Sequence, residues 1–225
     1  MGLPGLLPEA GGSEEGKASE GGGLPVRMLV ACEFSGIVRD AFAAKGWDAW
    51  SCDLLPSEKP GNHIQANMWG DGILHQNWDM LIFHLECTCM CNSGVRWLFR
   101  DRSKRIHTER WIRMVSDAKS FRDLMELPIP HIAGENPIMH KYAREIVGRG
   151  PDQIIQPWQF GHGETKATCL WLKNLPLLKP TNIVEGREQR IWKLPPGPNR
   201  WKERSRTLPG IAAAMAEQWG EVDCP

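Results

Sequence analysis

Three cysteines occupy alternate positions in the stretch "FHLECTCMCNSG", residues 83–94. His84 and Glu86 stand beside them, and the apolar run "MLIF" comes directly before. Thiols in such a place can bind a metal, form a disulfide, attack a carbon as a nucleophile, or fill a buried strand end. The remainder of the chain must distinguish these four uses.

A zinc site is the first use to weigh. Cys87, Cys89 and Cys91 would share one face of an extended strand, and His84 could join them. Structural zinc sites usually combine C-x2-C pairs with a second ligand pair from elsewhere, which this sequence lacks. We therefore expect no metal, and we expect packing to be the role of two of the three thiols.

A nucleophilic thiol needs an acid as its partner. Glu135, in the stretch "GENP", follows a second apolar run, "IPHIA". A thiolate that adds to an unsaturated pyrimidine carbon requires the ring nitrogen to be protonated or hydrogen-bonded as charge develops, and a glutamic acid can do this. One cysteine and one glutamate on neighbouring strand ends are the minimum apparatus for this reaction.

Apolar runs and helical periodicities alternate along the chain. Strands are predicted at 26–32, 47–53, 78–84, 129–137, 153–156 and 167–172, and helices at 37–46, 104–127 and 209–220. The stretch 129–137 is expected to end in a Glu-Asn-Pro turn. This alternation predicts an α/β fold, with a mostly parallel central sheet and helices on both faces.

Ligands of such sheets bind at the carboxyl ends of the strands. That rule places four groups of polar residues on one rim: Glu33 to Gly36, Asp53, His84 to Cys91, and Glu135 to Pro137. The chemistry is therefore expected at this rim.

Composition bounds the class of protein. The chain has 225 residues, 41% hydrophobic and 24% charged, with a formal net charge of zero, which suits one α/β domain at residues 26–220. Residues 1–25 are acidic and glycine-rich and are expected to be a disordered tail, and 221–225 a second short tail. No segment approaches the roughly 18 apolar residues that span a bilayer, and no signal peptide is evident. A cytoplasmic protein with reduced cysteines is expected.

Basic residues gather in two runs, which makes a polyanion partner plausible. One run covers 96–113 and includes Arg102 and Lys104, and the other covers 187–206 within a proline-rich stretch, 180–207. We expect 180–207 to form a surface loop or a small binding lobe. Either run could instead be an ordinary solvated face.

The turn "CEFSG" is not a dinucleotide fingerprint or a phosphate loop. Asp53, at the end of the next strand, could accept both hydroxyls of a ribose. Together they suit a nucleoside cofactor without a pyrophosphate, such as S-adenosylmethionine. A purely structural turn, with an acid at the start of a helix, is the alternative.

The order of these motifs resembles that of the small phage and prophage DNA cytosine-5 methyltransferases, over residues 26–220. The resemblance lies in "LVACEFSGIVRDAF", Asp53, the "HxxC" loop from His84 to Cys87, "ENP" at 135–137, and "RSRTLPGIAAAMAEQW" near the C-terminus. It implies a Rossmann-like class I methyltransferase fold, a cytoplasmic monomer, and a role in restriction-modification.

The resemblance also implies roles for individual residues. Cys87 would add to C6 of a flipped cytosine, and Glu135 would be the acid at its N3. The S-adenosylmethionine site would comprise Glu33, Phe34, Ser35, Gly36, Asp53, Asn67 and His84. Double-stranded DNA would be contacted by Asn136, Pro137, Lys166, Arg187, Arg190, Arg204 and Arg206.

The chain departs from the family pattern at several positions. Leu85 and Glu86 replace the prolines that precede the family's cysteine, and Asn67 stands where the family has an acid. An inactive relative that binds S-adenosylmethionine and nucleic acid is therefore an alternative. An amino-group (N4 or N6) DNA methyltransferase is another, although "HLEC" supplies neither the Pro-Pro pair nor the aromatic ring that such enzymes use.

Overall fold

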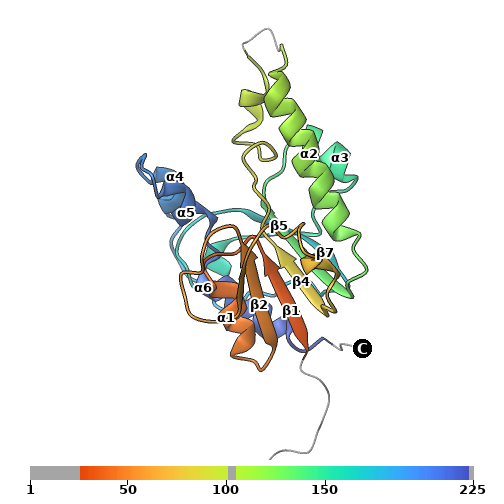
Figure 1. The fold of residues 1–225 in the computed structure, drawn as a ribbon. Coiled ribbons are helices and arrows are strands. Elements are labelled where there is room, and N and C mark those ends of the chain that lie inside the picture. The colour runs from red at the N-terminus through yellow and green to blue at the C-terminus, as the bar shows by residue number, and fades with distance from the viewer. Residues whose placement is uncertain (1–25, 101–104, 223–225) are drawn as a thin grey trace, which may run out of the picture.

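The computed structural model describes residues 26–100 and 105–222, and the expected acidic tail at 1–25 lies outside them. One seven-stranded sheet runs through the molecule in the order β3-β2-β1-β4-β5-β7-β6 (Figure 1). The strands are β1 Arg27–Ala31, β2 Asp48–Asp53, β3 His63–Gln65, β4 Met80–Phe83, β5 His131–Pro137, β6 Gln153–Ile155 and β7 Thr168–Lys173. Strands β3, β2, β1, β4 and β5 pair in parallel, whereas β7 runs antiparallel to both β5 and β6. The expected α/β fold with a mostly parallel sheet is confirmed.

Helices cover both faces of this sheet (Figure 1). All four residues of β4 are fully buried, as expected for a parallel strand between two layers. Phe121 of α2 and Ala143 of α3 pack on one face, and Phe42 of α1 and Met215 of α6 pack on the other. The helices are α1 Ile37–Ala43, α2 Thr108–Met125, α3 Lys141–Val147, α4 Arg190–Lys193, α5 Arg200–Ser205 and α6 Pro209–Trp219, with 3-10 turns η1 Ile73–His75, η2 Val95–Leu98 and η3 Pro157–Gln159.

Helix α2 begins at Thr108, later than the predicted 104. Residues just before it pair with the end of η2: the Arg100 N–H donates to the Arg105 carbonyl at 2.8 Å, and the His107 N–H to the Leu98 carbonyl at 2.8 Å. Extended pairing there excludes helix. We call residues 95–100 and 105–125 the arm. Its η2 end and the start of α2 project beyond the carboxyl ends of the strands, whereas the end of α2 packs on the sheet (Figure 1). Arg102 and Lys104 of the first basic run lie outside the described residues.

The predicted Glu-Asn-Pro turn is wrong, because β5 continues through Pro137. Glu135, Asn136 and Pro137 pair with Leu170, Cys169 and Thr168 of the antiparallel strand β7. A strand thus carries Glu135, which fixes its position more firmly than a loop would.

The proline-rich stretch 180–207 contains two short helices, α4 and α5, which were not predicted. Arg200 joins them: its Nε donates to the Leu194 carbonyl at 2.7 Å and its Nη2 to the Trp192 carbonyl at 3.3 Å. We call residues 187–206 the basic lobe. Within the described ranges, no helix has the length and apolar character to cross a membrane.

Candidate functional site at the carboxyl rim

The sheet register brings the candidate residues to one rim. Ala31 pairs with Cys52 on one side and with Phe83 on the other, and Phe83 pairs with Gly134. The residues that follow these positions therefore lie on adjacent strand ends, as the sequence analysis expected.

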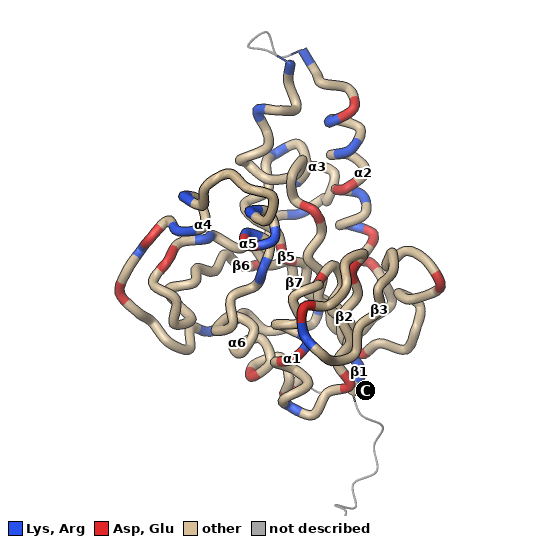
Figure 2. Tube along the Cα trace, turned by 60° about the vertical axis from the view of Figure 1, so that its left-hand side comes forward, with Lys and Arg blue, Asp and Glu red and all other residues tan. Residues whose placement is uncertain are grey.

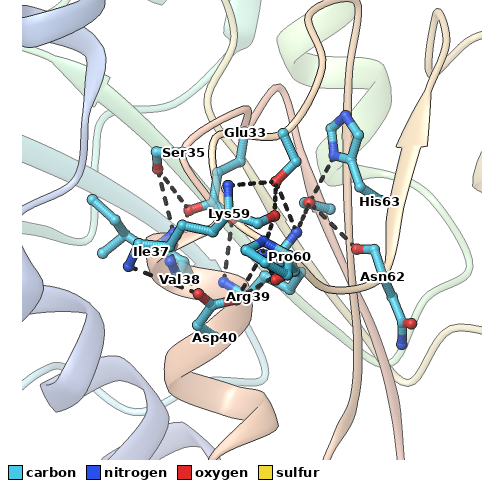
Figure 3. Close-up of polar contacts among 12 residues, drawn as sticks. Glu33, Ser35, Ile37, Val38, Arg39, Asp40, Lys59, Pro60, Asn62 and His63 are labelled. Atoms are coloured by element: carbon cyan, nitrogen blue, oxygen red, sulfur yellow. Dashed lines mark hydrogen bonds and ion pairs between the residues drawn. The ribbon is translucent and has the colours of Figure 1, made fainter.

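Glu33 is buried, with 4% of its surface exposed, and its carboxylate caps helix α1 (Figure 3). One carboxylate oxygen accepts the Val38 N–H at 2.7 Å and the Ser35 hydroxyl at 3.3 Å, and the other accepts the Arg39 N–H at 3.2 Å. An acid at this position accepts hydrogen bonds from N–H groups that have no partner within the helix. Its negative charge also interacts favourably with the positive end of the helix dipole. The Glu33 carboxylate is thus engaged by hydrogen bonds from its own chain.

Gly36 makes this turn possible. Its φ of +68° lies in the left-handed region, and a Cβ there would come within 2.4 Å of Nη2 of Arg39. A side chain at position 36 would therefore strain the turn and displace Arg39.

Arg39 is a buried ion that the sequence analysis missed (Figure 3). Its guanidinium donates to the Ser51 hydroxyl at 3.2 Å, the Ser57 hydroxyl at 3.1 Å and the Pro60 carbonyl at 2.9 Å, and it pairs with Asp40 at 2.7 Å. These bonds tie α1 to the segment between β2 and β3. The sequence feature that could have indicated the burial of Arg39 is its place between Val38 and Phe42, two buried residues of the same helix.

Asp53 ends β2 with one carboxylate oxygen still available. Its Oδ1 accepts the Leu55 N–H at 2.9 Å, and its Oδ2 has no hydrogen bond with any described residue. Leu54 beside it is 72% exposed, an apolar side chain that sequence reasoning did not select. Asn67 is exposed two residues past β3, and its Oδ1 accepts the Trp69 N–H at 3.2 Å.

His84 and Glu135 meet across β4 and β5, with Nδ1 of His84 3.2 Å from Oε2 of Glu135. Burial by itself raises the pKa of Glu135, but the hydrogen bond with His84, the charges of His84 and Lys166, and the Thr168 hydroxyl together hold that pKa below its ordinary value. Nε2 of His84 is buried and has no partner among the described residues. Glu135 is therefore a carboxylate at neutral pH in the free protein.

A cavity of about 10 Å³ lies beside Glu135. It is lined by Glu135, Lys166, Thr168, Thr207, Leu208, Ile211 and Met215. This volume suits one water molecule and not a pyrimidine ring. A base could reach Glu135 through this cavity only if some of the lining residues moved.

Cys87 and Cys91 form a pair of unequal thiols. Cys87 is half-buried and Cys91 buried, and the Cys91 N–H donates to the Cys87 carbonyl at 3.0 Å in a tight turn. The hydrogen bond with Cys91, then burial, then the charges of Cys91 and Glu135 raise the pKa of Cys87. The hydrogen bond from Cys87 lowers the pKa of Cys91 more than burial raises it, aided by the Ser93 hydroxyl at 3.0 Å. The shared hydrogen bond therefore favours the thiolate on Cys91 over the thiolate on Cys87.

Glu86 turns away from Cys87 toward the arm, where it pairs with Arg113. Glu86 is not among the groups that shift the pKa of Cys87. A carboxylate next to a thiol in the sequence would ordinarily raise the pKa of that thiol, but the ion pair with Arg113 directs Glu86 away from Cys87.

The basic residues chosen as DNA contacts are mostly held by internal partners. Arg190 pairs with Glu164 at 3.0 Å, Arg187 stacks over Trp158 at 4.0 Å, Arg206 pairs with Glu58 at 2.6 Å, and the Lys166 ammonium donates to the Arg206 carbonyl at 3.1 Å. Arg204 is exposed and makes no ion pair within the described ranges.

Asn136, also chosen as a DNA contact, is fully buried, and its Nδ2 donates to the Pro137 carbonyl at 2.7 Å. Its amide is therefore not presented to a partner in this conformation.

In the part of the chain that the structure describes, no group of three or more His, Cys, Asp or Glu side chains is placed to hold a metal ion. The six described cysteines are free thiols.

The strand order and the single reversed strand β7 define a Rossmann-like α/β fold. No protein-family model matches the sequence, and no curated protein matches it either. Similar solved structures include an inferred DNA modification methyltransferase encoded within an E. coli prophage, with 13% identity and a TM-score of 0.42 over 76% of this chain and 55% of that one. Another is the Entamoeba histolytica methyltransferase EhMeth, with 15% identity and a TM-score of 0.46 over 75% of this chain and 59% of that one. The chain thus spans less than two thirds of either protein, and similarity of this degree identifies no reaction.

Proposed function

We propose that this protein is a DNA cytosine-5 methyltransferase that uses S-adenosylmethionine and acts as a monomer in the cytoplasm. The observation that carries the proposal is one rim with three features: a capped strand-to-helix turn, a strand-end acid with a free oxygen, and a thiol, Cys87, on which the charge of Glu135 acts.

The residues of the rim suit S-adenosylmethionine. Oδ2 of Asp53 is available to accept a ribose hydroxyl, and the exposed Leu54 offers an apolar surface for the flat adenine. The methionine part would lie against the turn that holds Phe34 and Gly36, which is linked to β2 by the Glu33 N–H donating to the Cys52 carbonyl at 3.2 Å. When bound, S-adenosylmethionine supplies an electrophilic methyl group.

The chain's own residues would activate the cytosine. The Cys87 sulfur adds to C6 of the flipped base as its proton passes to Cys91, and Glu135 stabilises the charge that develops at N3. Glu135 is ionised in the free protein, so it must gain a proton when the base replaces its polar neighbours. Loss of the C5 proton after methyl transfer lets the thiol leave C6 again.

Double-stranded DNA is the proposed substrate because both the arm and the basic lobe carry Lys and Arg side chains. Figure 2 shows Lys and Arg along α2 and along α4 and α5. The start of α2 and the basic lobe both stand beyond the carboxyl ends of the strands, so a duplex lying across the rim would meet basic side chains on two sides.

Transfer of a labelled methyl group tests the proposal. The full chain is incubated with methyl-labelled S-adenosylmethionine and cytosine-containing duplex DNA, and the DNA is digested to nucleosides. We expect label in 5-methylcytosine with the native protein and none with Cys87→Ser. Label in an N4-methylcytosine or N6-methyladenine would show amino-group chemistry instead.

A binding protein without turnover is the second candidate. It is favoured by the raised pKa of Cys87, by the small cavity at Glu135 and by the ionised state of Glu135. Saturable binding of cofactor and DNA, with no label in any base, would establish it.

A further inference from the structure

The basic lobe lies over the turn that follows β1. The Phe34 and Trp201 rings meet edge to face, with centroids 6.0 Å apart, and the Arg206 guanidinium lies 5.9 Å from the Phe34 ring. Phe34 is only 5% exposed as a result. Helix α5 therefore forms a wall of the proposed cofactor site.

Lys202 projects from this wall without an acidic partner. Its ammonium lies 5.8 Å from the Phe34 ring centroid and 5.7 Å from that of Trp201, and the residue is half-buried. No described carboxylate lies within ion-pair distance of it, whereas Arg206 beside it is held by Glu58 and Glu203. The two rings attract the ammonium but supply no negative charge, so a ligand carboxylate would provide the counter-charge that this cation lacks.

The turn itself offers little to an incoming carboxylate. The first N–H groups of α1 are already taken: those of Val38 and Arg39 by Glu33, and that of Ile37 by the Ser35 hydroxyl at 3.4 Å. The buried Glu33 carboxylate also repels a second anion. The carboxylate of a ligand with an amino-acid group therefore needs a positively charged partner from outside this turn. Lys202 lies over the turn and carries that charge.

We propose that Lys202 binds the carboxylate of the amino-acid part of S-adenosylmethionine, so that the basic lobe completes the cofactor site. This inference rests on the proposed cofactor. It assigns Lys202 a role in ligand recognition that is separate from any contact with DNA.

Two ligands with the same nucleoside and sulfur distinguish a contact of Lys202 with the amino-acid group from a general effect of the substitution on the site. S-adenosylhomocysteine carries the amino-acid group, and 5′-methylthioadenosine lacks it. Calorimetry on the full chain should show that Lys202→Met weakens the binding of S-adenosylhomocysteine by about tenfold or more, as expected for the loss of a charge-assisted contact. The binding of 5′-methylthioadenosine should weaken by less than about twofold. Lys202→Arg should restore part of the affinity.

Lys45→Ala is the matched control, because it removes one exposed positive charge just beyond the opposite end of α1. It should change neither affinity. Equal losses for both ligands in Lys202→Met, or no loss for either, would overturn the inference while leaving the cofactor intact. Failure of the native chain to bind either ligand would instead contradict the proposed function, and the inference with it.

Discussion

Arg206 and Glu58, 148 positions apart in the chain, join the basic lobe to the segment after β2. Nη2 of Arg206 lies 2.6 Å and 2.7 Å from the two carboxylate oxygens of Glu58, and the Glu58 N–H donates to the Phe34 carbonyl at 2.8 Å. The lobe is thereby linked to the proposed cofactor turn. Arg206, selected from the sequence as a DNA contact, has a structural role in this conformation.

Breaking this pair should loosen the lobe without unfolding the sheet. Both side chains are partly exposed, so a double-mutant cycle with Arg206→Ala and Glu58→Ala should give a coupling of about 0.2–1 kcal/mol in the free energy of unfolding. Hydrogen exchange at 200–208 should quicken in either variant. Unchanged exchange there would contradict a latching role.

Much of the fold was predictable because buried parallel strands are continuous apolar runs. "MLIF" at β4 and the run at β1 show this directly, and the acids Asp53 and Glu135 follow such runs. Long-range pairing was not predictable: nothing local indicates that β7 pairs with Glu135 to Pro137. Strand β3 was missed because only one of its three residues, Ile64, is apolar, so it forms no apolar run.

The contacts that surround the site residues were also not predictable from the sequence. The burial of Arg39 depends on hydroxyls and carbonyls from 12 to 21 positions away. The orientation of Glu86 depends on Arg113, 27 positions along the chain. The difference in pKa between Cys87 and Cys91 depends on a turn, whereas the alternate spacing of the cysteines suggested an extended strand.

Asp53→Ala should weaken S-adenosylmethionine binding by about 1–3 kcal/mol, because it removes charge-assisted hydrogen bonds to the ribose. Calorimetry on the full chain measures this directly. Asp123→Ala, an exposed acid on α2, is the control and should have no effect. Unchanged affinity in Asp53→Ala would remove this residue from the site.

Arg204→Ala should weaken binding to duplex DNA of any sequence and lower the magnitude of the salt slope by about one. The reason is that Arg204 is exposed and makes no ion pair with a described residue. Titrations at several salt concentrations give the slope, and Lys45→Ala again serves as the control. A slope equal to that of the native protein would make this part of the lobe an ordinary solvated surface.

Glu135→Gln should lower stability in a pH-dependent way. The pKa of Glu135 is below its ordinary value in the fold, so its ionised form stabilises the protein above the unfolded pKa, about 4.3, and this contribution is lost as pH falls through the folded pKa. Denaturant unfolding should show a deficit of about 1–3 kcal/mol at pH 7 that narrows toward pH 3. A deficit independent of pH would show that packing, and not charge, is responsible.

Covalent trapping on DNA identifies which thiol is the nucleophile. The protein is incubated with S-adenosylmethionine and duplex DNA that contains 5-fluorocytosine, in which the fluorine prevents release of the thiol after methyl transfer. We predict a complex resistant to denaturation for the native chain and for Cys89→Ser, a weaker yield for Cys91→Ser, and none for Cys87→Ser. A complex that survives Cys87→Ser, or the absence of any complex even in Glu86→Pro, would contradict the account.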